Sequence, residues 1–126
     1  MKLEYLDWVN NYKDKIVRLY DFDSTEACLL RDAINNTIVK EHHNLELSKT
    51  SYIDAVNCSL TLSITDSDEG IFKKGPASFV CNLSVEGYKN MATLLEPFCT
   101  AASSDYQWLY HSNTPIDLLL SPDGEW

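Results

Sequence analysis

The sequence predicts an α+β fold of two layers, in which helices pack on one face of a mainly antiparallel four-stranded sheet, in the order α-α-β-β-α-β-β. Three observations lead to this prediction. Residues 56–64 alternate between apolar and polar side chains, which is typical of a strand with one buried face. Residues 106–121 contain two further alternating runs separated by a polar break. Two segments carry apolar residues at helical spacing: Ala27, Leu30, Ile34 and Ile38, then Val85, Tyr88, Ala92 and Leu95.

The chain has 126 residues, of which 44% are hydrophobic and 23% are charged. This composition is ordinary for a globular protein, and the length suits one domain over residues 1–126. We see no linker and no internal repeat in the sequence.

The N-terminal segment can be interpreted in two ways. Leu6, Val9 and Tyr12 share a helical stripe that continues through Ile16 and Leu19, which favours one long helix from Leu3 to Tyr20. In the alternative, the helix breaks near Lys13 and "KIVRLYDF" forms a strand.

The next elements follow from local start and stop signals. Asp23 can cap a helix, with Glu26 three residues later as in a capping box. "TDSDEG" turns the chain after the alternating strand, and a second strand with Phe79, Cys81 and Leu83 starts after Gly75-Pro76. Ser84 is expected to cap the third helix, and Pro97 to end it.

The C-terminal hairpin, Tyr106–His111 with Ile116–Ser121, has two possible registers. A four-residue loop places the aromatic residues on the open sheet face as a binding patch, whereas a five-residue loop buries them. We favour the five-residue loop, which turns Leu109 and Leu119 outward as a small exposed or partner-covered pair. We expect Trp126 to fold back over the sheet edge. The candidate binding residues are therefore Tyr106, Trp108, Tyr110, Leu109 and Leu119.

Charge restricts the partners. The formal net charge is −9, and no Lys or Arg follows Lys89, whereas Glu96, Asp105, Asp117, Asp123 and Glu125 do. Such a field repels phosphate backbones, so we expect no nucleic-acid partner, but it attracts a basic protein. The charged N-terminus is unlike a signal peptide, and no apolar run approaches the roughly 20 residues that span a bilayer. We therefore expect a cytoplasmic protein without membrane contact, and four free, buried thiols.

One stretch suggests catalysis. "IVRLYDFDSTEA" resembles the first motif of the haloacid dehalogenase phosphatases, a hydrophobic strand followed by DxDxT. The resemblance implies that Asp21 attacks phosphorus, that Asp23 acts as acid and base, that Thr25 supports them, and that Mg²⁺ binds alongside. It covers about ten residues, and the chain beyond them predicts an antiparallel sheet instead of the parallel sheet of that family.

Two further motifs contain residue types that can bind metal ions. "DSDEG" is similar to a calcium loop, but an EF-hand loop needs glycine at its sixth position and glutamate at its twelfth. Counted from Asp66, Gly70 is at the fifth position and Ala77 at the twelfth, so we interpret the stretch as an acidic turn. His42 and His43 are adjacent, which points them apart on a helix.

The sequence therefore predicts no cofactor and favours a non-catalytic protein-interaction module, similar to an immunity protein or inhibitor of a basic partner. The alternative is a Mg-dependent phosphotransfer enzyme using Asp21–Thr25, which requires a strand ending at Asp21.

Overall fold

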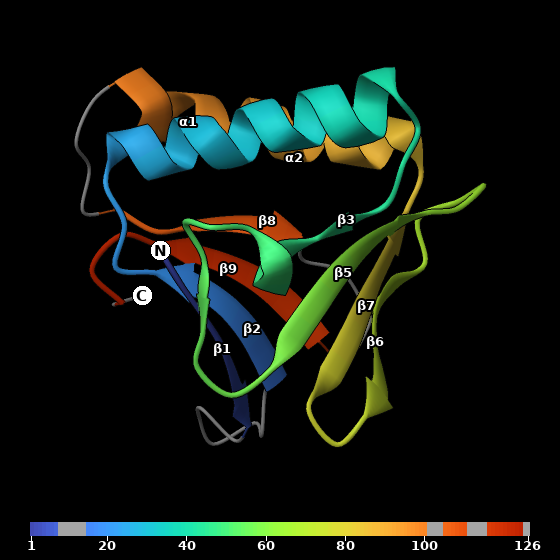
Figure 1. The fold of residues 1–126 in the computed structure, drawn as a ribbon, viewed down its shortest axis with the longest axis horizontal. Helices are drawn as coiled ribbons and strands as arrows, with labels where there is room; N and C mark the ends of the chain where they lie inside the picture. The colour runs from blue at the N-terminus through green and yellow to red at the C-terminus, as the bar shows by residue number, and fades with distance from the viewer. Residues whose placement is uncertain (8–14, 101–104, 111–115, 125–126) are drawn as a thin grey trace.

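The computed structural model describes residues 1–7, 15–100, 105–110 and 116–124 and has an α+β fold (Figure 1). The predicted α+β class is confirmed. The predicted order of elements and the single, mainly antiparallel four-stranded sheet match only in part, because the strands form two mixed sheets of five and four strands. The elements along the chain are β1 (Lys2–Asp7), β2 (Lys15–Tyr20), α1 (Ser24–Ala33), the π-helix η1 (Ile34–Lys40), β3 (Leu45–Glu46), the 3₁₀-helix η2 (Leu47–Lys49), β4 (Asp54–Ala55), β5 (Ser59–Ile64), β6 (Gly70–Gly75), β7 (Ser78–Leu83), α2 (Val85–Thr100), β8 (Gln107–Tyr110) and β9 (Ile116–Ser121).

The N-terminal segment contains strands β1 and β2, which pair antiparallel. The favoured long helix from Leu3 to Tyr20 is therefore wrong, and the alternative strand over the second half of the segment is correct. The physical reason lies in β2, where Ile16, Val17 and Leu19 are all buried. A strand that is covered on both faces loses its alternation, and its apolar spacing then imitates a helix.

The predicted helix start at Asp23 is confirmed. The Asp23 carboxylate accepts a hydrogen bond from the Glu26 amide at 2.9 Å, and the Glu26 carboxylate accepts one from the Asp23 amide at 3.3 Å. This capping box satisfies amide groups that have no partner inside the helix. The predicted inward face is also confirmed, since Ala27, Leu30, Ile34 and Ile38 are all buried.

Helix α2 begins as predicted but ends later. The Ser84 hydroxyl accepts a hydrogen bond from the Gly87 amide at 3.1 Å. Pro97 does not end the helix, which continues to Thr100. Pro97 has no backbone N–H to bond to the carbonyl oxygen of Thr93, so the helix passes this position with one backbone hydrogen bond fewer. The hydroxyl of buried Tyr88 lies 2.6 Å from the Ser63 carbonyl oxygen and 2.7 Å from the Cys81 carbonyl oxygen, which ties α2 to β5 and β7.

The strands form two mixed sheets. Sheet A has the order β4-β1-β2-β9-β8, and sheet B has the order β3-β5-β7-β6. The expected alternation is confirmed at Leu60 and Leu62, which are buried. The expected strand start at residue 56 is wrong, because β5 begins at Ser59 and Val56 is 48% exposed, and β5 pairs parallel to β7. Sequence reasoning missed β6, an edge strand whose central residues Phe72, Lys73 and Lys74 are exposed, so that it carries no inward pattern.

The two halves of the chain repeat one topology that the sequence does not reveal. The first half consists of the hairpin β1-β2, helix α1 and the antiparallel pair β3-β5, and the second consists of the hairpin β6-β7, helix α2 and the antiparallel pair β8-β9. Parallel pairings of β2 with β9 and of β7 with β5 then join the halves. Each sheet therefore combines the hairpin of one half with the last strand pair of the other.

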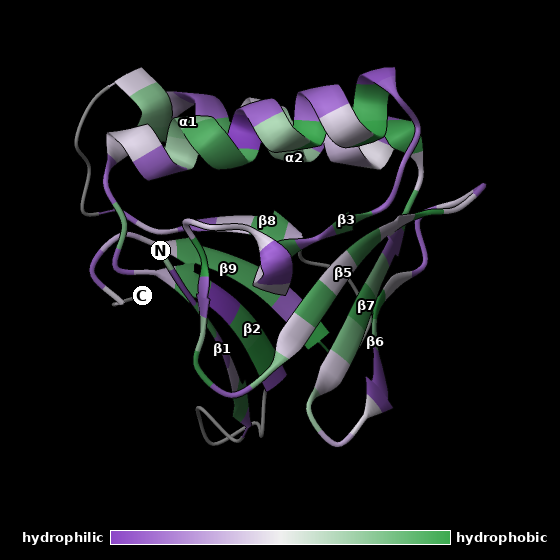
Figure 2. Ribbon diagram, viewed as in Figure 1, coloured by the Kyte–Doolittle hydropathy of each residue, from purple (hydrophilic) through white to green (hydrophobic). Residues whose placement is uncertain are grey.

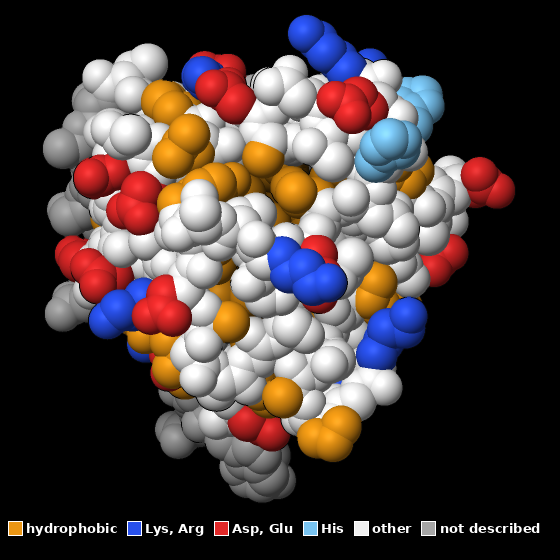
Figure 3. All heavy atoms as spheres, viewed as in Figure 1, with side chains coloured by type: hydrophobic (Ala, Val, Ile, Leu, Met, Phe, Trp, Pro, Cys, Tyr) orange, Lys and Arg blue, Asp and Glu red, His pale blue; other side chains and the backbone are white. Residues whose placement is uncertain are grey.

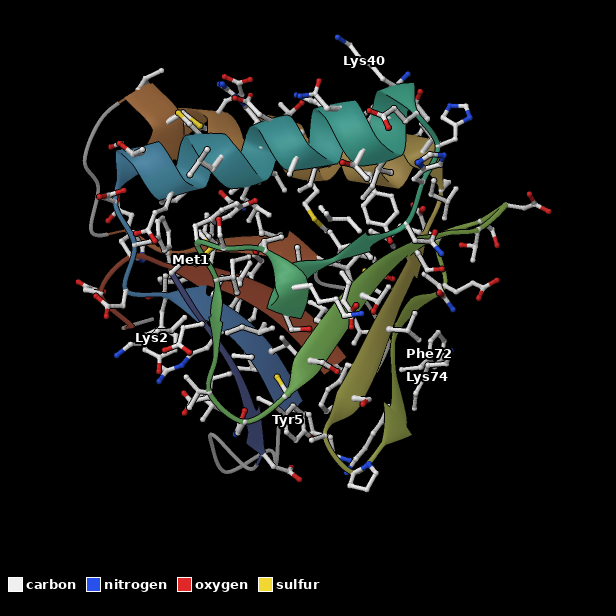
Figure 4. The ribbon with its side chains drawn as sticks, in the orientation of Figure 1. Met1, Lys2, Tyr5, Lys40, Phe72 and Lys74 are labelled. Carbon is white, nitrogen blue, oxygen red and sulfur yellow. The ribbon has the colours of Figure 1, made fainter. Side chains whose placement is uncertain are left out.

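The helices lie side by side in opposite directions, with both sheets beneath them (Figure 1). Hydrophobic residues occur along both helices and along the strands beneath them (Figure 2), and the buried ones form one cluster. Where the sheets converge, Tyr5 of β1 packs against Phe79 of β7, with ring centroids 4.5 Å apart (Figure 4). One core therefore connects both sheets and both helices.

Candidate protein-interaction site

The helix-free face of sheet A carries a row of four residues from four adjacent strands. The register pairs Glu4 of β1 with Arg18 of β2, Arg18 with Leu119 of β9, and Leu119 with Trp108 of β8. Directly paired residues on adjacent strands present their side chains on the same face. A charged pair thus occupies one end of the row, and an aromatic residue occupies the other.

Arg18 organises the charged end. Its guanidinium donates to one Glu4 carboxylate oxygen from two nitrogens, at 2.9 and 2.6 Å, and it donates to the Gly124 carbonyl oxygen at 2.9 Å. The guanidinium also stacks over the Tyr20 ring, 3.9 Å from the centroid. Gly124 has a φ of +83°, so the turn after β9 can approach this pair closely. These contacts join β1, β2 and the turn after β9.

The register of the C-terminal hairpin differs from both simple alternatives. Trp108 pairs with Leu119, as the four-residue loop requires, but a bulge then pairs Tyr110 with Leu118. The prediction that Trp108 joins the core is therefore wrong, whereas Tyr110 does pack against the core. The expected exposed pair is also wrong, because Leu109 is 5% exposed and Leu119 is fully buried. A bulge reverses side-chain parity within one strand, which the sequence pattern does not reveal.

An aromatic pair remains accessible at the edge of this face. Tyr106 is 48% exposed, and its ring lies edge-on to the Trp108 ring with centroids 6.3 Å apart. β8 is the edge strand of sheet A, so Trp108 lies at the border of the sheet. Asp105 precedes the pair, and acidic side chains gather on the side of the molecule where α1 begins (Figure 3). His111, residues 112–115 and Trp126 lie outside the described residues.

The second candidate site, from Asp21 to Thr25, agrees in part with the phosphatase resemblance, but Asp23 also has a structural role as a helix cap. β2 ends at Tyr20, so Asp21 does follow a strand, as the phosphatase resemblance requires. Asp21 has a φ of +54°, and its exposed carboxylate lies 3.4 Å from the Lys2 ammonium. The Asp23 carboxylate is engaged in the capping box. Across the described ranges, no three His, Cys, Asp or Glu side chains are grouped so that they could hold a metal ion.

The acidic turn before β6 has a structural role. The Asp68 carboxylate accepts hydrogen bonds from the Ser84 amide and from the Ser84 hydroxyl, both at 2.8 Å. A negative charge here is favourable beside the amino end of α2.

The four cysteines fall into two classes. Cys58 and Cys81 are buried free thiols, as predicted. Burial is the main cause that raises the pKa of Cys58 to about 11 and the pKa of Cys81 to about 12. Cys28 and Cys99 are partly exposed, contrary to the prediction that all four are buried.

Comparison of the chain with protein-family models, curated proteins and solved structures finds no match. None of the helices in the described part of the chain combines the length and the hydropathy needed to cross a bilayer.

Proposed function

We propose that the protein is a non-catalytic interaction module, and that the edge aromatics Tyr106 and Trp108 contact a basic protein partner, in the manner of an immunity protein or an inhibitor. The observation that carries this proposal is the accessible Tyr106–Trp108 pair on the helix-free side of sheet A. Tyrosine and tryptophan are enriched among the residues that contribute most to protein interfaces.

The surrounding charge supports a basic partner. Carboxylates of Asp105, Asp117 and Asp123 belong to the segment that lacks Lys and Arg. Of the cations on the helix-free face, Arg18 is paired with Glu4, and Lys2 lies near Asp21. An arginine or lysine from a partner can stack on the aromatic rings and meet the negative field around them.

The test is site-specific photocrosslinking in the native host. A benzophenone amino acid replaces Tyr106 in one variant and Phe72 in the control variant. The two positions are matched, because Phe72 is 44% exposed on β6, the edge strand of the other sheet (Figure 4). We expect one dominant crosslinked protein of basic isoelectric point from position 106 and none from position 72. Absence of a product at position 106, or the same products at both positions, would overturn the proposal.

A second measurement addresses the energetics. With the crosslinked protein purified, Tyr106→Ala is expected to weaken its binding at least about tenfold, as removal of an interface hot spot does. Phe72→Ala is expected to leave the dissociation constant unchanged. Added salt should weaken binding to the wild-type protein, since part of the attraction is electrostatic.

The phosphotransfer enzyme remains the second candidate. Its support is the strand β2, which ends immediately before Asp21.

A further inference from the structure

Two partly exposed cysteines meet where α1 begins and α2 ends. The Cys28 thiol lies 3.6 Å from the carbonyl oxygen of Cys99, although 71 residues separate them in the chain. Neighbouring contacts hold the two helices in this alignment. Arg31 of α1 and Glu96 of α2 form an ion pair at 3.0 Å, and the rings of Phe22 and Phe98 pack edge to face with centroids 6.2 Å apart.

The Cys99 thiol in turn donates to the Leu95 carbonyl oxygen at 3.5 Å. Burial, together with a smaller contribution from the neighbouring Cys28 side chain, raises the pKa of Cys99 to about 12. The Arg31 guanidinium acts in the opposite direction and favours the thiolate. Both thiols are more accessible than those of Cys58 and Cys81, which are buried. The pair is thus the one place in the described structure where a small oxidant can reach two adjacent thiols.

We propose that Cys28 and Cys99 form a redox modification site, at which a hydroperoxide oxidant such as hydrogen peroxide converts the dithiol into an intramolecular disulfide. A disulfide requires two cysteines whose backbones are close and whose side chains point toward each other. The Cys28 thiol already lies against the Cys99 backbone, so side-chain rotation and a small helix adjustment would bring the two sulfur atoms together. This site does not depend on the proposed partner binding.

The chemistry balances with one peroxide per disulfide. One thiolate attacks a peroxide oxygen, the O–O bond breaks, and a sulfenic acid and hydroxide form. The second thiol loses its proton as its sulfur attacks the sulfenic sulfur, the S–O bond breaks, and the S–S bond forms. The released hydroxide groups leave as water with the two thiol protons. The sulfurs are oxidised and the peroxide is reduced, and an external thiol reverses the change.

The disulfide would join the first turns of α1 to the last turn of α2 and close a long loop through the core. A crosslink of this span restricts the unfolded chain and stabilises the native state, provided that it does not strain the fold. Oxidation is therefore expected to raise the midpoint of thermal unfolding. Because the attacking species is a thiolate and Cys99 holds its proton strongly, the reaction is expected to be slow at neutral pH.

The test uses the folded wild-type protein with hydrogen peroxide, followed by alkylation of free thiols, non-reducing digestion and mass spectrometry. We expect a peptide containing Cys28 linked to one containing Cys99, with the mass of two hydrogen atoms missing, and its loss on treatment with dithiothreitol. Cys28→Ser and Cys99→Ser should each abolish the linked peptide, whereas Cys58→Ala should keep it. Folding of each variant is checked by circular dichroism.

Two results would overturn the proposal. In the first, Cys28 and Cys99 remain alkylatable or advance to sulfinic acids without a linked peptide. In the second, disulfides form between molecules or with Cys58 or Cys81 at least as readily. Both are measured on the wild-type protein, so the proposal can fail even if a serine variant does not fold.

Discussion

Gly87 of α2 lies directly against the Asp68 carboxylate, so that a Cβ on Gly87 would stand 2.6 Å from Asp68 Oδ1. The same carboxylate oxygen accepts both hydrogen bonds from Ser84. The absence of a side chain at Gly87 thus allows the loop before β6 to attach to the amino end of α2.

This relationship predicts that Gly87→Ala and Asp68→Ala are coupled in a double-mutant cycle. In wild type, Gly87→Ala must displace Asp68, and the lost hydrogen bonds are expected to outweigh the roughly 1 kcal/mol that alanine adds to helix stability. In the Asp68→Ala background only the 3.1 Å approach of the new Cβ to Leu83 Cβ remains, so Gly87→Ala should cost much less. Urea unfolding should give a coupling energy of about 1–2 kcal/mol. Additive effects of the two substitutions would contradict the contact.

The Arg18–Glu4 pair predicts a second cycle. Their side chains are only 17% and 19% exposed, so Arg18→Leu leaves a poorly solvated carboxylate and is expected to cost about 2 kcal/mol of unfolding free energy. Glu4→Leu combined with Arg18→Leu should cost less than Arg18→Leu alone, because no unpaired charge remains. As a control, Arg31→Leu breaks the more exposed pair with Glu96 and should cost below about 1 kcal/mol. A double variant less stable than the Arg18 single variant would refute this account.

The buried thiol of Cys81 predicts alkaline destabilisation. Burial raises its pKa from 9.0 to about 12, so the folded protein keeps the proton over a range in which the unfolded chain releases it. Its contribution to stability is fully present below about pH 9 and is lost as the pH rises from 9 toward 12, by about 1.4 kcal/mol per pH unit. Equilibrium unfolding at pH 8 and pH 10.5 should show this loss. Cys81→Val should reduce the difference, since it removes one of the ionising groups, and an unchanged pH dependence would count against the assignment.

The phosphotransfer alternative is tested at Asp21 and Asp23. We expect no Mg²⁺-dependent hydrolysis of a generic phosphomonoester, and therefore no deficit in Asp21→Asn. Asparagine tolerates the left-handed φ of this position, so the variant should also keep its fold. Asp23→Ala should lower stability by about 1 kcal/mol through loss of the helix cap. Mg²⁺-dependent activity that disappears in Asp21→Asn would show that the protein is a phosphotransfer enzyme and would contradict the proposal of a non-catalytic interaction module.

The features that could be predicted from the sequence are those set by local chemistry. The Asp23–Glu26 capping box, the inward face of α1 and the alternation in β5 each depend on a few neighbouring residues. The features that could not be predicted depend on distant partners. Ile16 and Leu19 lie on opposite faces of β2 and are both buried, because both faces of this strand are covered. The local sequence pattern of β2 does not indicate that its second face is covered.

The candidate site shows the same division. The four-residue loop, which was the less favoured register, predicts aromatic side chains on the open face of the sheet. In the structure Tyr106 is exposed and Trp108 is partly exposed. The bulge that buries Leu109 and turns Tyr110 inward changes parity within a single strand, so no choice of one loop length could place all five residues. The meeting of Cys28 with Cys99 has no local signal at all.

The exchange of strand pairs between the halves affects how the protein is made. β9 is the last strand that the structure describes, yet it lies inside sheet A between β2 and β8. While residues 116–121 are still within the ribosome, β2 therefore has an open edge, and the buried side chains of Val17 and Leu19 lack their neighbours. Contacts between residues this distant in sequence fold slowly, and open strand edges favour aggregation. The nascent chain from which residues 116–121 have not yet emerged is thus the state in which this protein most needs protection by chaperones.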